Sequence, residues 1–297
     1  MLEIKAVTKK FGNDIAVDHL NMVLEPGRVM GLIGQNGAGK TTTFRMILDF
    51  IQPTSGSILW NNQPIDLKAK QRIGFLPEER GLYQKITVEE QILYFAELHG
   101  MRRSDARQAL MEWMKRLDVV GKVTDKVQKL SKGNAQKVQL IASVIFQPEF
   151  VILDEPFSGL DPVNMSIMMS EIQRLRDQGA MIIFSSHDMN NVSHISDDLT
   201  MLKKGKTVLQ GGLKEIRERY GRTKLYIESP LTMSQLRSIP GVTQVTAQEN
   251  GLLVELAAEN VVKVIFEKAT AKGLIRTFTQ HQRTLHDISR MELVAQV

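Results

Sequence analysis

The feature that most constrains this chain is the glycine-rich segment Gly34–Thr41, which reads GQNGAGKT. It follows the continuous apolar run Val29–Ile33, which predicts a strand buried on both faces of a parallel sheet, and it precedes the helical pattern Thr42–Phe50. A glycine-rich loop in this place lets backbone N–H groups close round phosphate oxygens, and the helix adds its positive N-terminal end. The segment therefore predicts a phosphate-binding P-loop.

Lysine and threonine side chains at the end of this loop have defined tasks in phosphate chemistry. We expect Lys40 to reach the β- and γ-phosphates of a nucleotide and the Thr41 hydroxyl to ligate Mg²⁺. A nucleotide and Mg²⁺ are therefore the expected cofactors. The nucleotide contacts predicted from the loop are Gly34, Asn36, Gly37, Ala38, Gly39, Lys40, Thr41 and Thr42.

A second apolar strand pattern, Val151–Leu153, ends in two carboxylates, Asp154 and Glu155. This is the Walker B pattern. With a P-loop upstream, we expect Asp154 to hold Mg²⁺ through water and Glu155 to polarise the attacking water. A base in this place argues for hydrolysis of the nucleotide rather than binding alone.

A third segment indicates the family. Leu130–Asn134 reads LSKGN and opens a helical pattern with Ser131 as its N-cap. It resembles the signature motif of ABC ATPases, usually LSGGQ. Other motifs of that family follow in the same order: Ser158–Asp161 resembles the D-loop, and His187, after the strand pattern MIIFSS, resembles the switch histidine. Phe11 matches the aromatic residue that stacks on adenine.

This resemblance covers about residues 1–220 and implies a head-to-tail dimer in which the P-loop of one subunit and the signature of the other enclose each ATP. Ser131 and Gly133 would then act in trans, on the γ-phosphate bound at the P-loop of the other subunit. His187 would contact the γ-phosphate in cis. The nucleotide contacts that the resemblance adds are Phe11, Ser131, Gly133, Asn134 and Asp161, and the catalytic residues it implies are Glu155, His187 and Lys40.

The chain departs from the family pattern in two places. The family usually has glutamine where the segment IGFLPEER places Glu78; because a glutamate can ligate Mg²⁺ or orient its water, Glu78 joins Thr41 and Asp154 as an expected metal ligand. In the signature, Lys132 replaces the usual glycine and adds a cation near the interfacial phosphates. Asn134 replaces the usual glutamine and keeps the amide on a shorter side chain. The segments IGFLPEERGLY and LSKGN together resemble the ATPase subunits of ABC-2-type exporters, the branch of the sodium-efflux subunit NatA.

Alternating strand and helix patterns predict an α/β fold for residues 1–221: a mainly parallel sheet, an antiparallel β-subdomain and a helical subdomain inserted over about 88–147. Two local signals stand out, a capping box of Thr87 with Glu90 and a hairpin turn at Asn61-Asn62. Residues 222–297 predict a small C-terminal accessory domain of the ferredoxin-like α+β class, in the order βαββαβ, with a hairpin at Asn250-Gly251.

Composition excludes several other classes of protein. No cysteine occurs, which excludes disulfides, thiolate zinc sites, iron–sulfur clusters and thiol nucleophiles. The 38 Lys and Arg against 33 Asp and Glu give a net charge of +5 without a long basic run, so no nucleic-acid partner is expected. No apolar stretch reaches the about 18 residues of a membrane span, and the start MLEIKAVTKK lacks the apolar core of an export signal.

The resemblance implies an ATP-hydrolysing motor subunit of an ABC-2-type membrane exporter. Such a chain is cytoplasmic and peripheral on the cytoplasmic face of the cell membrane. ATP would close a homodimer, or a heterodimer with a related ATPase, and polytopic membrane subunits on a separate chain would convert the movement into efflux of an ion, drug or peptide.

Two alternatives stay open, a soluble ABC ATPase acting on ribosomes or nucleic acid and a non-transport nucleotide switch. The presence of one P-loop, one signature and no long heptad run disfavours the first. The intact set of catalytic residues disfavours the second, and only turnover measurements can dismiss it. A GTPase is less consistent still, because the base-reading motif N-K-x-D is missing and residues 131–134 read SKGN.

Overall fold

The computed structural model describes the backbone of residues 1–79 and 81–295, with side chains described as far as Glu292. Contacts divide the chain into two compact units, one ending at Gln210 and the other beginning at Gly211. The division lies before the domain boundary expected near residue 222, and the short helix α8 (Leu213–Tyr220) falls between the two positions. The boundary between 1–221 and 222–297 stays a prediction.

A mainly parallel sheet forms the centre of the first unit. In spatial order its strands are β5 (Ile73–Leu76), β6 (Phe150–Leu153), β7 (Met181–Ser186), β3 (Val29–Ile33), β8 (Asp198–Lys203) and β9 (Lys206–Gly212). The pairings from β5 through β8 are parallel. Every residue of β3, β6 and β7 is buried, as expected for a sheet covered on both faces. The predicted α/β class is confirmed.

Helices connect these parallel strands. They are α1 (Lys40–Ile47) after β3, α6 (Pro162–Asp177) before β7 and α7 (Met189–Ile195) after β7. The strand–loop–helix context that the sequence predicts for the glycine-rich segment is therefore observed. The helix begins at Lys40 rather than after Thr41, so the end of the predicted loop forms the first helical turn.

A separate antiparallel sheet, in the order β2-β1-β4, forms the predicted β-subdomain. Its strands are β1 (Leu2–Phe11), β2 (Asp14–Leu24) and β4 (Ser55–Trp60). The turn predicted at Asn61-Asn62 forms, with both residues at positive φ and with Trp60 and Gln63 exchanging backbone hydrogen bonds of 2.8 and 3.1 Å, but the pairing ends at this one bridge. The chain then continues into the short helix α2 (Leu67–Lys70).

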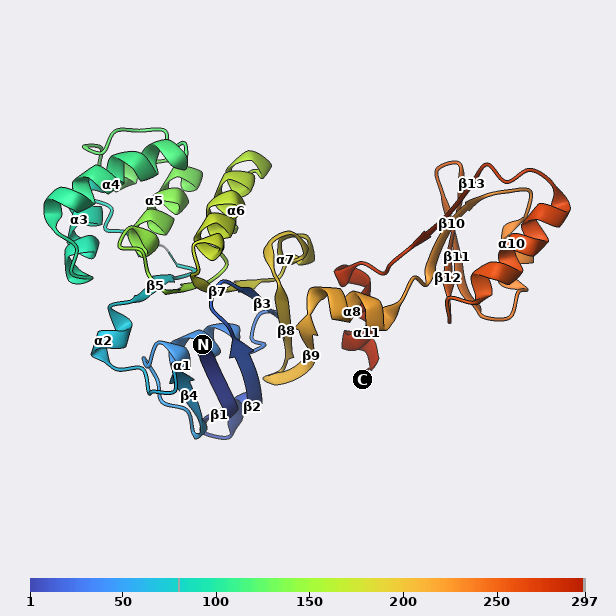
Figure 1. Cartoon of the computed structure of the whole chain (residues 1–297), viewed down its shortest axis with the longest axis horizontal. Helices are drawn as coiled ribbons and strands as arrows, with labels where there is room; N and C mark the ends of the chain where they lie inside the picture. The colour runs from blue at the N-terminus through green and yellow to red at the C-terminus, as the bar shows by residue number, and fades with distance from the viewer. Residues whose placement is uncertain (80, 296–297) are drawn as a thin grey trace. The chain divides into compact units, whose positions relative to one another are not determined.

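The inserted helical subdomain contains α3 (Val88–Leu98), α4 (Arg103–Arg116), the 3₁₀ turn Val127–Lys129 and α5 (Lys132–Val144). In Figure 1 these green helices gather above the strands of the parallel sheet, and β1, β2 and β4 lie below them. The predicted capping box is present: the Thr87 hydroxyl accepts the Glu90 N–H at 3.1 Å, and the Glu90 carboxylate accepts the Thr87 N–H at 2.8 Å. It fixes where α3 begins.

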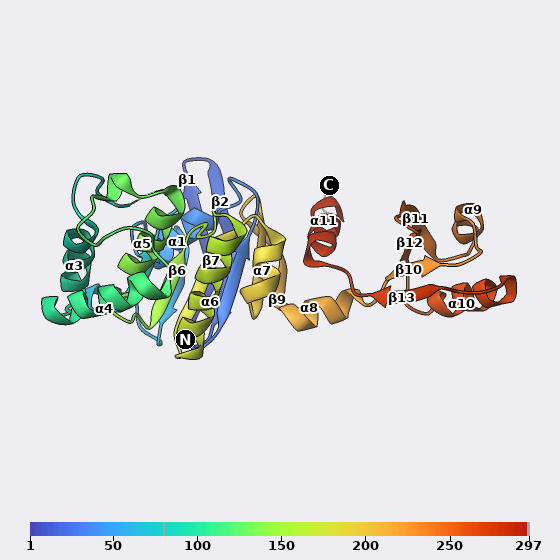
Figure 2. The ribbon, with the colours of Figure 1, turned by 90° about the horizontal axis from the view of Figure 1, so that it is seen from above.

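The second unit contains the predicted βαββαβ order. Its elements are β10 (Lys224–Glu228), α9 (Met233–Arg237), β11 (Val242–Gln248), β12 (Gly251–Leu256), α10 (Val261–Lys272) and β13 (Thr277–His281), followed by α11 (Leu285–Ala295). The antiparallel sheet has the order β11-β12-β10-β13. Helices α9 and α10 lie beside the sheet (Figure 2), and Leu236 and Ile265 from these helices pack into its core.

The sequence predicts the β11–β12 turn at Asn250-Gly251, and the structure places it one residue earlier. Gln248 pairs with Gly251, so the loop is Glu249-Asn250, with Glu249 at φ +43°. Gly251 is already in β12, where a Cβ would lie 2.7 Å from the Ile227 carbonyl oxygen. Close strand packing, rather than the turn, requires this glycine.

Within the described residues, no helix is both long enough and apolar enough to cross a membrane.

Candidate nucleotide-binding site

A cleft of about 330 Å³ opens at the carboxyl ends of β3, β5 and β6. Because these ends meet at one edge of a parallel sheet, they bring together residues that lie far apart in the sequence. Strand β3 leads into the P-loop, β6 into Asp154, and β5 into the segment that carries Glu78. The lining residues are Ala16, Asn36, Gly37, Ala38, Gly39, Lys40, Thr41, Thr42, Glu78, Asp154 and Glu155.

The P-loop gives this cleft its positive wall. Lys40 and Thr41 lie in the first turn of α1, where backbone N–H groups have no partner within the helix and favour an anion. Gly39 has φ +108°, and a Cβ there would lie 2.5 Å from the Ala16 carbonyl oxygen, so the turn needs glycine. The buried Lys40 ammonium donates to the Gly34 carbonyl at 2.7 Å. A strong cation is thus held at the wall of the cleft.

Asp154 is fixed by hydroxyl groups on both of its carboxylate oxygens. Thr41 donates to one oxygen at 3.1 Å and Ser185, in β7, donates to the other at 2.5 Å. The Ser185 oxygen also accepts the Glu155 N–H at 2.8 Å, so one hydroxyl positions both acids. The sequence analysis missed Ser185. Its signal is weak, a hydroxyl in the apolar run MIIFSS, and its meaning depends on the pairing of β6 with β7.

Glu155 is nearly buried and is held between two basic side chains. Its carboxylate lies 3.9 Å from the Lys40 ammonium, and its other oxygen is 3.0 Å from His187 Nδ1. The backbone of Glu155 has φ +48°, a left-handed conformation that is uncommon outside glycine and costs free energy. The fold therefore holds this carboxylate in a strained position, where it faces the cleft next to the cation.

The oxygen ligands in the cleft suit a hard divalent cation. Thr41, Asp154 and Glu78 supply a hydroxyl and two carboxylates, and Mg²⁺ prefers such oxygen donors completed by water and phosphate. Among residues 1–79 and 81–292, no three His, Asp or Glu side chains cluster as a metal site. The residues present thus fit an ion that is shared with a nucleotide rather than one held by the protein alone.

The signature residues do not line the cleft; they lie at the amino end of α5. Ser131 is exposed and caps α5 by accepting the Asn134 N–H at 3.3 Å. The Asn134 amide also donates to Ser131 Oγ at 3.0 Å, and its oxygen accepts the Val120 N–H at 3.0 Å. A Cβ on Gly133 would lie 3.2 Å from the Asn164 side chain, which explains the glycine. This helix end faces solvent in the single chain.

The predicted contacts outside the cleft lining also include Gly34, His187, Asp161 and Phe11. Asp161 is exposed and caps α6, where its carboxylate accepts the N–H groups of Val163 and Asn164, both at 3.0 Å. The hydrogen bond from Asn164 is the main reason why the pKa of Asp161 is lowered. Phe11 ends β1 with half of its surface exposed, and the Lys9 ammonium lies 5.1 Å from its ring centroid.

Two family models match the chain. Residues 17–158 match the model described as ABC transporter, and residues 211–291 match the model described as ATP-binding protein DrrA1-3-like, C-terminal domain.

Curated relatives match over most of their length. An uncharacterized ABC transporter ATP-binding protein, YhaQ of Bacillus subtilis, is 43% identical over 97% of this chain and 97% of its own. The ABC transporter ATP-binding protein NatA of the same species is 35% identical over 68% of this chain and 84% of its own. The linearmycin resistance ATP-binding protein LnrL, also of that species, is 28% identical over 91% of both chains. The resemblance to NatA is confirmed.

A solved structure shows the same fold. The ATP-binding subunit of an ABC transporter superposes with a TM-score of 0.69 and 26% identity, over 74% of this chain and 93% of the other. The motif order, the cleft and these matches agree. The chain belongs to the family of ABC transporter ATP-binding proteins, and it is an ATPase of that family.

Proposed function

We propose that this chain is the ATP-hydrolysing motor subunit of an ABC-2-type membrane exporter. The observation that carries the proposal is the convergence of Lys40, Asp154 and Glu155 in one cleft beside the open first turn of α1. Bound Mg²⁺ would neutralise phosphate charge in this cleft. The antibiotic resistance named for LnrL favours export over other transport tasks.

The side chains in the cleft divide the work of hydrolysis between them. Lys40 would bind the phosphates of ATP, and Thr41, Asp154 and Glu78 would hold the metal ion. Glu155 would take a proton from the water that attacks the γ-phosphorus, while the bond to the ADP oxygen breaks. His187, in contact with Glu155 and two-thirds exposed, can reach the γ-phosphate from the same subunit.

A second copy, or a related ATPase, would complete the site. Ser131, Gly133 and Lys132 lie at an exposed helix end outside the cleft of their own chain. A head-to-tail dimer would bring this positive end to the ATP held by the P-loop of the other subunit. Asp161 and Phe11 would complete the contacts, at the dimer interface and at the adenine. ATP binding would therefore close the dimer.

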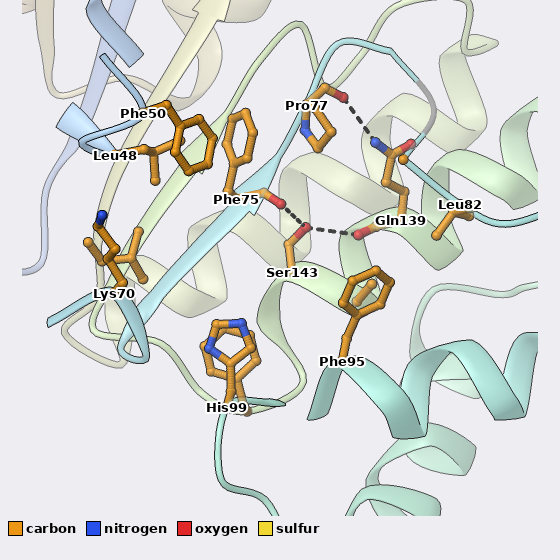
Figure 3. Close-up of a pocket in the computed structure, with 14 residues that line it drawn as sticks. Leu48, Phe50, Lys70, Phe75, Pro77, Leu82, Phe95, His99, Gln139 and Ser143 are labelled. Atoms are coloured by element: carbon orange, nitrogen blue, oxygen red, sulfur yellow. Dashed lines mark hydrogen bonds between the residues drawn. The ribbon is translucent and has the colours of Figure 1, made fainter. Parts of the chain in front are cut away.

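The membrane subunit would dock in the groove that Figure 3 shows between the sheet and the helical subdomain. The groove measures about 370 Å³ and is lined mainly by apolar side chains, such as Phe75 from β5 and Phe95 from α3. Phe50 in the lining is 62% exposed, as is Tyr83 next to the lining residue Leu82, and Tyr94 on α3 is half exposed. Apolar surface of this kind marks a binding site for another protein. We assign it to a helix of the polytopic subunit, which would keep this chain on the cytoplasmic face of the membrane.

Tyr83 tests the docking site. Tyr83→Ala should weaken transport and co-purification with the membrane subunit, and it should leave the Kd for ATP unchanged, because Tyr83 lies outside the cleft. Unchanged transport in this variant would show that the membrane subunit does not dock in the groove. Arg80, a second residue of this segment that we would expect to act in coupling, lies outside the described residues.

The function is tested with Glu155→Gln, which keeps the shape of the side chain and removes the base. ATP binding should be retained, turnover should fall by about 100-fold or more, and the closed dimer should accumulate. The tagged variant is captured with ATP and Mg²⁺ from detergent-solubilised native membranes, and its companions are identified by mass spectrometry. Glu149→Gln, an exposed ion-pair partner of Arg72, is the matched control.

A multi-span membrane protein in stoichiometric amount would support the exporter. Ribosomal or nucleic-acid-associated proteins in its place would favour the soluble ATPase. Wild-type turnover in Glu155→Gln would remove Glu155 from its role, and no turnover in the unaltered chain would favour a nucleotide switch.

A further inference from the structure

Helix α5 carries a buried amide that reaches the loop after β5. Gln139 is 3% exposed, and its Nε2 donates to the carbonyl oxygens of Pro77 at 2.9 Å and Glu79 at 3.3 Å. Figure 3 shows the first of these bonds, with Gln139 pointing from α5 to the bend at Pro77. The two acceptors belong to the residues on either side of Glu78, which lines the cleft. Gln139 therefore holds the backbone that carries Glu78.

The far end of the same loop is held by a second buried glutamine. Gln91, on α3, is fully buried, and its side-chain oxygen accepts the Tyr83 N–H at 2.9 Å. Between these anchors, Glu78 faces the cleft, and Leu82 lines the groove drawn in Figure 3. The loop thus connects the nucleotide cleft to the groove, and its position depends on two side-chain amides.

Buried amides are a costly way to fill this space. Within the residues that the structure describes, Gln139 Oε1 and Gln91 Nε2 have no hydrogen-bond partner. A buried polar atom without a partner destabilises the fold, whereas a leucine of similar size would avoid that cost. Packing alone therefore does not account for an amide at position 139, but the bonds to the Pro77 and Glu79 carbonyls on either side of Glu78 do.

We propose that Gln139 is a positioning residue that sets the place of Glu78 in the nucleotide cleft and thereby the response of the ATPase to Mg²⁺. The inference rests on the proposed function, in which Glu78 helps to hold the metal ion. Gln139 itself does not line the cleft, so it would touch neither nucleotide nor metal.

The same helix also reaches the backbone next to a second acid of the cleft, Glu155. Gln136, three residues before Gln139 and thus on the same face of α5, donates from Nε2 to the Pro156 carbonyl at 3.1 Å. Pro156 directly follows Glu155. Because α5 begins beside Ser131, a rigid helix connects the signature end to the backbones that carry Glu78 and Glu155. A shift of that end when the dimer closes would move both acids together.

The test measures ATPase activity of the full-length chain against Mg²⁺ concentration. Gln139→Leu should raise the Mg²⁺ concentration for half-maximal activity by about 10-fold, a size typical of residues that orient metal ligands. The Kd for ATP without Mg²⁺ should not change. Gln210→Leu, which removes an amide bonded to the Asn21 carbonyl in the same unit, is the matched control and should leave the Mg²⁺ response unchanged.

A double variant separates positioning from general damage. Glu78→Ala alone should raise the Mg²⁺ requirement, and adding Gln139→Leu should raise it no further, since Gln139 acts through Glu78. Effects that multiply, or a normal Mg²⁺ response in Gln139→Leu, would overturn the proposal. ATP hydrolysis by the unaltered chain tests the proposed function separately, so either idea can fail without the other.

Gln139→Glu supplies a readout that a merely structural role would not move. The introduced carboxylate faces two carbonyl oxygens and cannot donate to them, whereas the protonated acid can. Burial raises the pKa of such a carboxyl, so the acid becomes protonated, and able to donate, as the pH is lowered. The activity of the variant relative to the unaltered chain should therefore increase as the pH is lowered from about 8 to about 6. A constant activity ratio over this range, in a variant that retains the thermal stability of the unaltered chain, would contradict the positioning role.

Discussion

The cleft beside α1 and the amino end of α5 carry two parts of what the sequence predicts to be one nucleotide site, and their physical character differs. In the cleft, Lys40, Asp154 and Glu155 are almost fully buried and in contact with one another or with Thr41 and Ser185. At the end of α5, Ser131 and Lys132 are exposed. The side-chain hydrogen bonds there cap the helix, through Ser131, and hold the neighbouring loop, through Asn134 and the Val120 N–H.

The difference teaches that the cleft is organised for chemistry within one chain, whereas the signature end is organised for contact with something outside it. Buried charges retain their geometry only where the fold supplies partners for them, and the cleft does so. An exposed helix end with a satisfied cap needs no further partner in the monomer, yet its dipole still attracts an anion. Variants of the two regions should therefore fail in different ways.

The largest effect is expected in the cleft. Lys40→Ala should weaken ATP binding by about 100-fold, because it removes a charged donor from a buried phosphate site. A titration with a fluorescent ATP analogue measures this directly. Lys206→Ala, at an exposed lysine of the same unit, should bind ATP normally. Tight ATP binding by Lys40→Ala would show that the buried cation of the cleft is not needed for binding, which would contradict the difference drawn between the two regions.

A smaller effect on binding, with a large effect on turnover, is expected at the signature end. Ser131→Asp keeps a good helix cap and places a carboxylate where the γ-phosphate bound by the partner would lie. ATP binding to the monomer should remain within about twofold, while like-charge repulsion lowers kcat by about 100-fold. The Kd and kcat are measured on the same preparation. If kcat stayed normal, the signature end would not act on the nucleotide.

The smallest effect is expected at Asp161, and it depends on pH. Bonds from the Asn164 and Val163 N–H groups lower its pKa, so their stabilising effect is present above the ordinary value of 3.8 and is lost as the pH falls through the lowered pKa. Asp161→Asn keeps a cap without the titration. Its melting temperature should match the unaltered chain near neutral pH and fall less steeply below about pH 4. An unchanged acid profile would show that the carboxylate does not stabilise α6.

The fold and the cleft could be predicted from the sequence where the signal is local. The run Val29–Ile33, the glycines after it and the acids after Val151–Leu153 each indicate a buried strand followed by a loop, and parallel strands then bring these loops to one edge. The capping box at Thr87 is likewise complete within four neighbouring residues.

Features that depend on long-range pairing could not be predicted. Ser185 meets Asp154 only because β7 lies next to β6, and Gln139 meets Pro77 only because α5 packs on the end of β5. The turn at Asn61-Asn62 forms as expected, but nothing in it indicates that β4 pairs with β1, a partner far away in sequence.

The central claim, that each site takes its P-loop from one chain and its signature from another, is tested by mixing two inactive variants. In a heterodimer of Lys40→Ala with Ser131→Asp, one of the two sites combines an intact P-loop with an intact signature. Random pairing should therefore restore about a quarter of the unaltered ATPase rate, whereas each variant alone stays inactive. Absence of any recovery, in mixtures shown by cross-linking to contain heterodimers, would contradict the claim.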